Sequence, residues 1–347
     1  MVIAVDTGNR CIKTAHADPF SAGLTRHFDA KPFIATDTLL YNGQYYTFSE
    51  MQGERREDKS IDDYYFMLTL AAIAREIVMK KALEKARPGE REKVVFSQAM
   101  REANRAKARF EEEIYLSVGL PPRDMVAGGS VIRGEKSMTT RYKEYFLRGG
   151  EHVVFQYNNM NFNIHIKEVF VSAQGFAAIF PNDLFAQVTK SPQAYIIDIG
   201  GYTTDIALVA NRRIDLNFFE SLDFGVIFLY SEIADMVKKN HGKDINGILI
   251  EAVLKGESIG DEAVEGTVRR VTERYAKQLA AALQDRKIDL ELSLPVLVGG
   301  GAQLMGTYLE AAIPRKNIFV IPDVRANAIG YEVFANRILK ERQKSNL

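Results

Sequence analysis

One short pattern occurs twice in the chain: an apolar strand that ends in Asp, then one residue, then Gly. The first copy is Ile3-Ala4-Val5-Asp6-Thr7-Gly8, and the second is Tyr195-Ile196-Ile197-Asp198-Ile199-Gly200. A return strand is predicted after each copy, at Cys11–His16 and at Asp205–Val209. In a chain of 347 residues the repeat therefore predicts two domains of related architecture, with a cleft between the copies.

The two aspartates of this pattern indicate a ligand. An Asp at the end of a buried strand is costly unless it meets a cation or hydrogen-bond donors. A glycine two residues later lets the turn approach a ligand closely with its backbone N–H groups exposed. Two such turns facing one cleft fit a polyphosphate, and Asp6 and Asp198 would then share Mg²⁺, because two carboxylates about 4 Å apart repel each other without a cation. The alternative is that each aspartate is an ordinary turn residue.

A third glycine-rich element follows the strand predicted at Leu294–Val298. It consists of Gly299, Gly300 and Gly301. Three consecutive glycines have a high entropic cost and no expected packing value, so they indicate close approach by a flat ligand. Their spacing differs from G-x-G-x-x-G, and the chain has no G-x-x-x-x-G-K-[ST], which excludes a P-loop nucleotide-binding site.

Strands and helices mix along the chain, which predicts an α/β architecture. The predicted first domain comprises residues 1–185 together with a C-terminal helix in 322–347, and the predicted second domain comprises residues 186–321. Further expectations concern single elements: short β-type runs in 31–50 such as Pro32–Ala35, a helix at Asp62–Lys85, a solvated helix in 84–112 that is broken at Pro88-Gly89, a strand at Ile114–Val118, a loop at Gly119–Pro122, a hairpin at 152–171, a helix at Ala173–Phe180, helices in 225–285 and a helix at Ile329–Leu347.

Composition excludes several classes of function. The 45 Lys and Arg residues balance 45 Asp and Glu residues, and a formal charge of zero argues against direct nucleic-acid binding, which depends on cationic neutralisation of phosphates. One cysteine and five scattered histidines give no zinc-ligand spacing. No apolar run approaches the roughly 18 residues that span a bilayer, and the first residues lack a signal-peptide pattern. We therefore expect a cytoplasmic protein without a membrane partner.

Taken in order, these motifs resemble those of the actin/Hsp70/sugar-kinase ATPase superfamily. Asp6–Lys13 resembles its phosphate motif one, Asp198–Asp205 its phosphate motif two and Val298–Ala302 its adenosine motif, while Val171–Ala178 and Asn327–Tyr331 are similar to its connecting helices. The resemblance implies two actin-like (ribonuclease H-like) domains around a nucleotide cleft. Within the superfamily, the Asp-x-Gly-Asn-x-x-x-Lys opening and the segment Tyr142–Phe146 make the chain most similar to the bacterial ParM-type actins, which segregate low-copy plasmids.

The resemblance also implies roles for individual residues. Asp6 and Asp198 would hold Mg²⁺, mostly through waters, and Gln174 would position the attacking water, with capping of its helix as the alternative. Actin has glutamine at the matching place, whereas some ParM-type relatives have glutamate. The nucleotide-binding residues implied are Asp6, Gly8, Asn9, Lys13, Gly200, Gly201, Thr203, Gly299, Gly300 and Gly301, while Asp205 is interpreted as structural.

The expected function is an ATPase whose nucleotide state controls assembly into head-to-tail filaments. Plasmid DNA would be held by a separate DNA-binding adaptor on a centromere-like site. Four questions stay open at this point: whether the chain prefers ATP or GTP, the filament geometry, the identity of the adaptor and the role of residues 84–112. The alternatives within the superfamily are a small-molecule (sugar-type) kinase, although no general-base Asp is evident between Leu120 and Gln174, and a chaperone-type ATPase.

Overall fold

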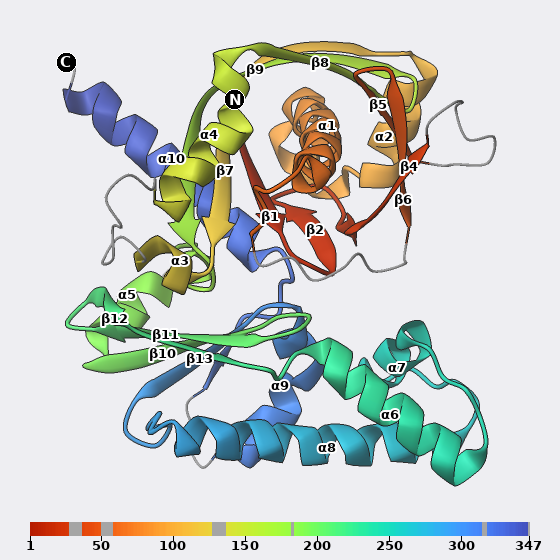
Figure 1. The fold of residues 1–347 in the computed structure, drawn as a ribbon, viewed down its shortest axis with the longest axis vertical. Coiled ribbons are helices and arrows are strands. Elements are labelled where there is room, and N and C mark those ends of the chain that lie inside the picture. Colours follow the sequence, from red (N-terminus) through yellow and green to blue (C-terminus); the bar gives the residue numbers. More distant parts are fainter. Residues whose placement is uncertain (28–36, 50–57, 127–136, 182–183, 314–317, 346–347) are drawn as a thin grey trace. The chain divides into compact units, whose positions relative to one another are not determined.

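The computed structural model describes residues 1–27, 37–49, 58–126, 137–181, 184–313 and 318–345. The chain divides into two compact units, Met1–Ala173 with Asn327–Leu347, and Gln174–Ala326. Each unit has its own mixed α/β core around one sheet and is described by itself (Figure 1). The chain passes between the units at 173/174 and 326/327, whereas the sequence pattern places these boundaries at 185/186 and 321/322.

The first unit is built on a sheet in which nine strands of the described chain pair in the order β3-β2-β1-β7-β9-β8-β5-β6-β4. The strands are β1 (Val2–Thr7), β2 (Cys11–Thr14), β3 (Phe20–Ser21), β4 (Gly23–His27), β5 (Thr38–Tyr41), β6 (Gln44–Ser49), β7 (Arg109–Leu120), β8 (His152–Tyr157) and β9 (Met160–Ala173). The predicted hairpin of residues 152–171 is confirmed as β8 and β9, whereas Pro32–Ala35 lies outside the described residues.

Helix α1 (Tyr64–Lys85) forms the centre of the first unit, and the sheet curves around it in Figure 1. Its side chains are buried on nearly all sides, as a helix enclosed by a sheet requires. The helix predicted at Asp62–Lys85 is thereby confirmed. The other helices in the described part of the unit are η1 (Pro88–Lys93, a 3₁₀ helix), α2 (Phe96–Arg105), α3 (Pro122–Val126), α4 (Met138–Leu147), η3 (Arg148–Gly150, 3₁₀) and α10 (Ala326–Ser345).

The second unit has a five-stranded sheet in its described part, in the order β12-β11-β10-β13-β14. Its main helices pack on the sheet through a core that includes Ile197, Leu229, Leu279 and Met305. The elements are η4 (Phe176–Ile179, 3₁₀), α5 (Leu184–Lys190), β10 (Gln193–Ile199), β11 (Thr204–Ala210), β12 (Arg213–Leu222), α6 (Val226–His241), α7 (Gly247–Leu254), α8 (Glu262–Asp285), β13 (Leu294–Val298), α9 (Gly300–Ala312) and β14 (Phe319–Val320).

The two sheets share one topology over five strands. In the first unit β1 pairs antiparallel with β2, β2 antiparallel with β3, and β1, β7 and β9 run parallel. In the second unit β10 pairs antiparallel with β11, β11 antiparallel with β12, and β10, β13 and β14 run parallel. The strand-Asp-x-Gly pattern occupies the first strand in both, so the two related α/β architectures expected from the repeat are confirmed.

Three local expectations are wrong. The predicted loop at Gly119–Pro122 begins two residues too early, because β7 continues to Leu120. The helix predicted at Ala173–Phe180 is reduced to η4, because Ala173 still belongs to β9 and Gly175 has φ of +75°. The break predicted at Pro88-Gly89 is confirmed, because α1 ends at Lys85 and η1 begins at Pro88. The rest of 84–112 is not solvated helix throughout: α2 packs against α1 through buried Phe96, and β7 already begins at Arg109.

Among the described residues, no helix is both long and apolar enough to cross a bilayer.

Candidate functional site

The first predicted hairpin places Asp6 opposite Lys13. These residues are register partners in the antiparallel pair β1–β2, and the Lys13 ammonium Nζ lies 3.3 Å from Asp6 Oδ2. The side chain of Asp6 is almost completely buried. The burial cost of this carboxylate is therefore offset by an ion pair within the hairpin itself.

The turn of this hairpin requires glycine at position 8. A Cβ atom on Gly8 would lie 2.7 Å from the carbonyl oxygen of Cys11, which is closer than real Cβ contacts allow. The next residue, Asn9, accepts a hydrogen bond through Oδ1 from the Tyr65 hydroxyl at 2.6 Å. Gly8, Asn9 and Lys13 thus lie together with Asp6 on one short hairpin.

Three side chains that the sequence motif does not contain also hold this turn. Tyr65 on α1 bonds Asn9, the Tyr142 hydroxyl on α4 lies 3.0 Å from Thr7 Oγ1, and the Lys59 ammonium donates to the Thr7 carbonyl oxygen. Burial raises the pKa of Tyr142, so its hydroxyl stays neutral. These residues lie far from the motif along the chain, and no sequence spacing identifies them.

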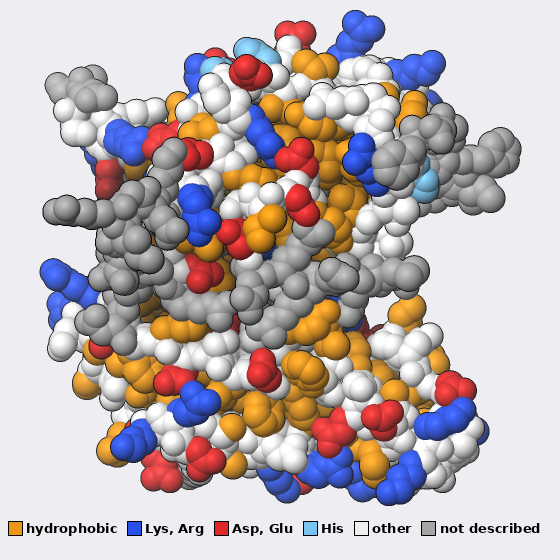
Figure 2. All heavy atoms as spheres, in the orientation of Figure 1, with side chains coloured by type: hydrophobic (Ala, Val, Ile, Leu, Met, Phe, Trp, Pro, Cys, Tyr) orange, Lys and Arg blue, Asp and Glu red, His pale blue; other side chains and the backbone are white. Residues whose placement is uncertain are grey.

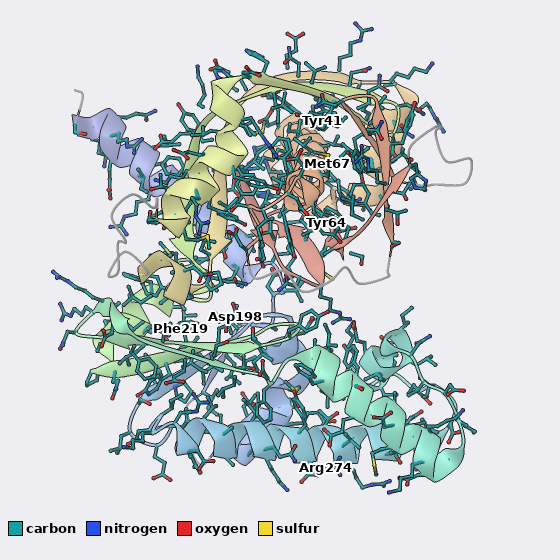
Figure 3. All side chains as sticks on the ribbon, in the orientation of Figure 1. Tyr41, Tyr64, Met67, Asp198, Phe219 and Arg274 are labelled. Atoms are coloured by element: carbon teal, nitrogen blue, oxygen red, sulfur yellow. The ribbon has the colours of Figure 1, made fainter. Side chains whose placement is uncertain are left out.

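The second predicted hairpin places Asp198 opposite Asp205 on β10 and β11. Asp198 is buried, and Figure 3 labels it on β10. Asp205 binds inside the hairpin region: the Ser221 hydroxyl donates to Oδ1 at 2.5 Å and the Thr203 hydroxyl donates to Oδ2 at 3.3 Å. These bonds join the hairpin to β12, so the contacts of Asp205 are structural.

Backbone hydrogen bonds join the Gly200-Gly201 turn to the first residues of α6. Gly200 N–H donates to the Thr203 carbonyl at 2.8 Å and closes the turn. The carbonyls of Gly200 and Gly201 accept from Val226 and Ile227, the first residues of α6, at 3.1 and 2.9 Å. The conformation of this turn is therefore fixed by the sheet on one side and by the start of a helix on the other.

Two further glycines, from separate parts of the sequence, approach Asp198. Gly299 has φ of +90°, and a Cβ atom there would lie 2.3 Å from Asp198 Oδ1. Gly175 has φ of +75°, and a Cβ atom there would lie 3.3 Å from Asp198 Cβ. The connecting segment, the second hairpin and the glycine triplet thus meet around one buried carboxylate, and we call this arrangement the Asp198 cluster.

The glycine triplet has packing value, contrary to expectation. Gly299 contacts Asp198 as described, and a Cβ atom on Gly301 would lie 2.2 Å from Ile199 Cγ2. Only Gly300 has no atom within 4 Å of the position a Cβ would take. Close packing on β10 therefore explains two of the three glycines without a ligand, and Gly300 is the one that faces open space.

Gln174 is the first residue of the second unit and lies in the turn between β9 and η4. The alternative that it caps a helix is wrong, because Gly175 is the N-cap of η4 and no side chain bonds there. Its half-buried amide makes no hydrogen bond to any described residue. Since Gly175 touches Asp198, Gln174 is adjacent in sequence to the Asp198 cluster.

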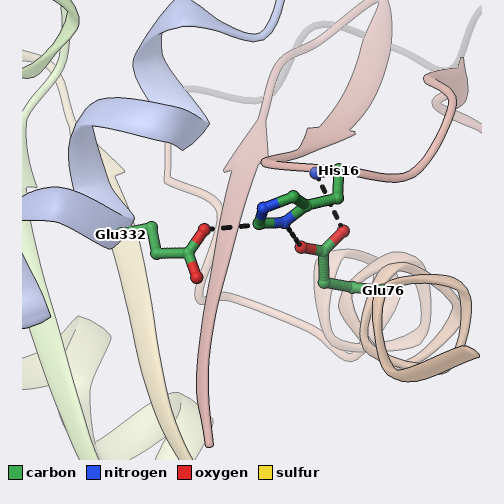
Figure 4. A group of neighbouring side chains, drawn as sticks. All are labelled: His16, Glu76 and Glu332. Atoms are coloured by element: carbon green, nitrogen blue, oxygen red, sulfur yellow. Dashed lines mark hydrogen bonds and ion pairs between the residues drawn. The ribbon is translucent and has the colours of Figure 1, made fainter. Parts of the chain in front are cut away.

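A group of titratable side chains lies elsewhere in the first unit (Figure 4). Among the described residues, His16, Glu76 and Glu332 form the one trio of His, Cys, Asp or Glu whose ligand atoms all lie within 4.8 Å of one another. The Glu76 carboxylate accepts from the backbone N–H groups of His16 and Ala17 at 3.1 and 2.9 Å and from His16 Nδ1 at 2.6 Å. Lys80 pairs with Glu332. With these donors and this ammonium already bound, we interpret the trio as a structural ion-pair network.

Comparisons with known proteins agree with the topology. Residues 196–311 match the family described as "Archaeal actin homologue MreB-like, C-terminal". A search of curated protein sequences finds no match.

Solved structures match over nearly the whole chain. The psk41 ParM protein superposes with a TM-score of 0.66 at 13% identity, covering 98% of both chains. Ta0583, an archaeal actin homologue, gives 0.67 at 16% identity and covers 97% of this chain and 99% of that one. ParM from a 15-stranded filament of Clostridium botulinum gives 0.64 at 16% identity, with 97% and 99% covered. The expected resemblance is confirmed at the level of fold: the chain has the two-unit actin-like fold.

Proposed function

We propose that the chain is a nucleotide-hydrolysing, actin-like filament protein that segregates plasmid DNA through a DNA-binding adaptor. The observation that carries this proposal is the repeated hairpin: each unit begins its shared topology with a strand whose buried Asp precedes a glycine turn. Packing alone does not require a buried carboxylate at the same place in both copies, whereas recognition of a charged ligand does require one.

In this proposal the two hairpins bind the phosphates of one nucleotide. The backbone and side-chain donors are Gly8, Asn9, Lys13, Gly200, Gly201 and Thr203, and Gly299, Gly300 and Gly301 border the nucleoside. Gly300, which faces open space, is the position where a flat group approaches the backbone most readily. ATP is the proposed nucleotide, and GTP is the other purine to be tested.

The donor chemistry of the hairpins fits Mg²⁺. Asp6 and Asp198 are buried carboxylates, and Mg²⁺ prefers oxygen ligands while keeping several waters when phosphates are present. These two residues are the proposed holders of the ion, which when bound neutralises charge on the phosphates. Lys13 lies at the same site through its ion pair with Asp6.

Gln174 is the proposed residue for positioning the attacking water. Hydrolysis of a phosphoanhydride requires mainly that the protein align the attacking water, and an amide can align a water without acting as a strong base. Replacing Gln174 by alanine is expected to lower the rate of nucleotide hydrolysis about 10- to 100-fold with little change in nucleotide affinity. Phosphate release and nucleotide binding, measured separately, check this, and Gln174→Glu serves as the conservative control. Equal losses in rate and affinity would contradict a role in aligning water.

Filament assembly and the adaptor are supported by the fold and by surface charge. The structural relatives include a ParM filament and a filament titled Alp12, and a head-to-tail contact between identical subunits generates an open helix. On the face shown in Figure 2, acidic and basic side chains are interspersed, in agreement with a formal charge of zero. A surface of this kind favours indirect capture of DNA, through an adaptor, over direct binding of phosphates.

Sedimentation of the full chain tests the proposal. At tens of micromolar protein, we expect pelleting with a non-hydrolysable ATP analogue and Mg²⁺, less pelleting with ADP, and filaments in the pellet by electron microscopy. Parallel samples with GTP decide the base preference. Absence of nucleotide-dependent pelleting would reject the filament proposal. ATP turnover that a sugar stimulates in a monomeric protein would favour a kinase instead, and turnover that unfolded polypeptide stimulates would favour a chaperone-type ATPase.

A further inference from the structure

One buried tyrosine of α8 reaches the start of α6. The Tyr275 side chain belongs to the core of the second unit, and its ring centroid lies 5.3 Å from that of Phe224. Its hydroxyl donates to the Gly225 carbonyl at 2.9 Å. Burial raises the pKa of Tyr275, so the hydroxyl keeps its proton and acts as a donor. The other α8 side chains in this core are Val, Leu and Ala, so packing alone does not require a hydroxyl at this position.

The Gly225 carbonyl belongs to a chain of hydrogen-bonded peptide groups. The peptide group that joins Gly225 to Val226 donates its N–H to the Gly200 carbonyl at 3.1 Å. In a planar trans peptide the C=O and the N–H point in opposite directions, so this one group links Tyr275 to the Gly200-Gly201 turn. The Gly225 carbonyl also accepts from the Leu229 N–H, at the longer distance of 3.4 Å.

This chain of peptide groups ends at the Gly201 N–H. Because the Gly200 carbonyl points toward α6, the N–H of the same peptide group, which belongs to Gly201, points away from α6. Within the described ranges of the chain, no atom accepts a hydrogen bond from this N–H, and Gly201 is only half-buried. An accessible N–H at the end of a hydrogen-bonded chain is polarised by the groups behind it, which favours an anionic acceptor.

Gly225 also packs directly on the Gly200-Gly201 turn. A Cβ atom on Gly225 would lie 2.2 Å from the Gly201 carbonyl oxygen. Contact with Gly225 therefore sets the position of the turn, and the hydrogen bond from Val226 sets the orientation of its first peptide group. Tyr275 acts on both through its bond to the Gly225 carbonyl.

We propose that Tyr275 is a positioning residue of the nucleotide site, which orients the Gly201 N–H toward a phosphate group through the peptide groups that follow Gly225 and Gly200. This inference rests on the proposed function, because it needs a phosphate at the second hairpin. A hydroxyl that only stabilised the core would change the free energy of unfolding and leave the affinity for a phosphate unchanged.

Tyr275→Phe tests the proposal, because it removes the hydroxyl and keeps the ring. We expect a non-hydrolysable ATP analogue to bind this variant roughly 3- to 10-fold more weakly than the parent chain. Adenosine, which has no phosphate, should bind both proteins alike. Tyr230→Phe is the matched control, because it removes a hydroxyl of the same unit that donates to Glu251 Oε1 instead, at 2.9 Å. Its affinity for the analogue should stay within about twofold of the parent value.

The amide proton of Gly201 provides a measurement without any ligand. Loss of the first hydrogen bond of the chain weakens the polarisation of the last N–H. The NMR chemical shift of the Gly201 amide proton should therefore move upfield in Tyr275→Phe and stay near the parent value in Tyr230→Phe.

Gly225→Ala disturbs the same turn by contact instead of by hydrogen bonding. The added methyl group would displace the Gly201 carbonyl, so this variant should weaken the analogue more than Tyr275→Phe does. Gly266→Ala is its control, because a Cβ atom there would meet only the far end of the Arg270 side chain, at 3.4 Å.

Three results would overturn the role of Tyr275 and leave the proposed function intact. The first is a folded Tyr275→Phe that binds the analogue as the parent chain does. The second is an equal loss of affinity for adenosine and for the analogue, and the third is an unchanged Gly201 amide shift. Failure of the parent chain to bind the analogue would overturn both the role of Tyr275 and the proposed function.

Discussion

Replacing Asp198 by asparagine is expected to lower nucleotide hydrolysis by about 100-fold or more and to leave the fold of the second unit intact. The side chain is buried, and asparagine has nearly the same shape. The substitution replaces one carboxylate oxygen by an amide nitrogen and removes the negative charge that the proposal assigns to the metal and phosphate site. Phosphate release and thermal unfolding measure the two effects.

Asp205 provides the matched control, because it is the register partner of Asp198 across the hairpin. Its carboxylate accepts hydrogen bonds from Ser221 and Thr203. Asp205→Asn should therefore lower stability by about 1–2 kcal/mol and affect hydrolysis less than Asp198→Asn does. If Asp198→Asn keeps turnover within threefold of the parent chain, the carboxylate has no part in the reaction and the proposed site is wrong.

Features that depend on local sequence could be predicted well. A strand that ends in Asp-x-Gly dictates both the chain reversal and the following strand, so β1–β2 and β10–β11 follow from a few residues each. Local sequence also predicted the helix at residues 64–85 and the end of β13 at the glycines that follow it. The repeat also predicted two related units, and the two sheets share their strand order over five strands.

Features that depend on distant contacts could not be predicted. Tyr65 and Lys59 reach the first hairpin only because the sheet wraps around α1 and brings the start of that helix to the turn. No periodicity contains that information. The glycine triplet shows the opposite error: a local pattern indicated a ligand, but the close approach at Gly301 is to Ile199 of the same unit. Strand pairing decides which glycines contact protein and which face open space.

Helix α10 depends both on local sequence, which could be predicted, and on distant contacts, which could not. Its helical character was predicted from local pattern, but its attachment to the first unit depends on single contacts. Gly119 on β7 leaves room for the Tyr331 ring, since a Cβ atom there would lie 1.9 Å from the hydroxyl oxygen. The Ser117 hydroxyl donates to the Tyr331 carbonyl at 2.9 Å. One turn of the helix therefore packs directly on a central strand, and Glu332 continues this attachment toward α1.

Lys80 on α1 pairs with Glu332, and Glu76 on the same helix holds His16, whose Nδ1 lies 3.6 Å from Glu332 Oε2. Replacing Glu76 by glutamine is expected to destabilise the first unit by about 2–4 kcal/mol at neutral pH. The carboxylate is fully buried and accepts three hydrogen bonds, two from backbone N–H groups and one from His16 Nδ1. A glutamine amide nitrogen cannot accept, so at least one buried donor loses its partner. Hydrogen exchange of amides in α1 and α10 is the measurement. Glu84→Gln, at an exposed position of the same helix, should change protection by less than about 0.5 kcal/mol.

The effect of Glu76→Gln should also depend on pH. Burial acts to raise the pKa of Glu76, but the hydrogen bond and charge of His16, together with Thr14 and Lys80, outweigh burial and hold this pKa below its ordinary value of 4.5. The unfolded chain then binds this proton more readily than the native chain, so the stabilisation is complete above the ordinary pKa and is lost as the pH falls through the lower, native value. The difference in stability between the parent chain and Glu76→Gln should accordingly shrink as the pH falls below the ordinary pKa of 4.5. A difference that stays constant down to pH 3 would mean that the ionised carboxylate is not what holds His16 and α10 to α1.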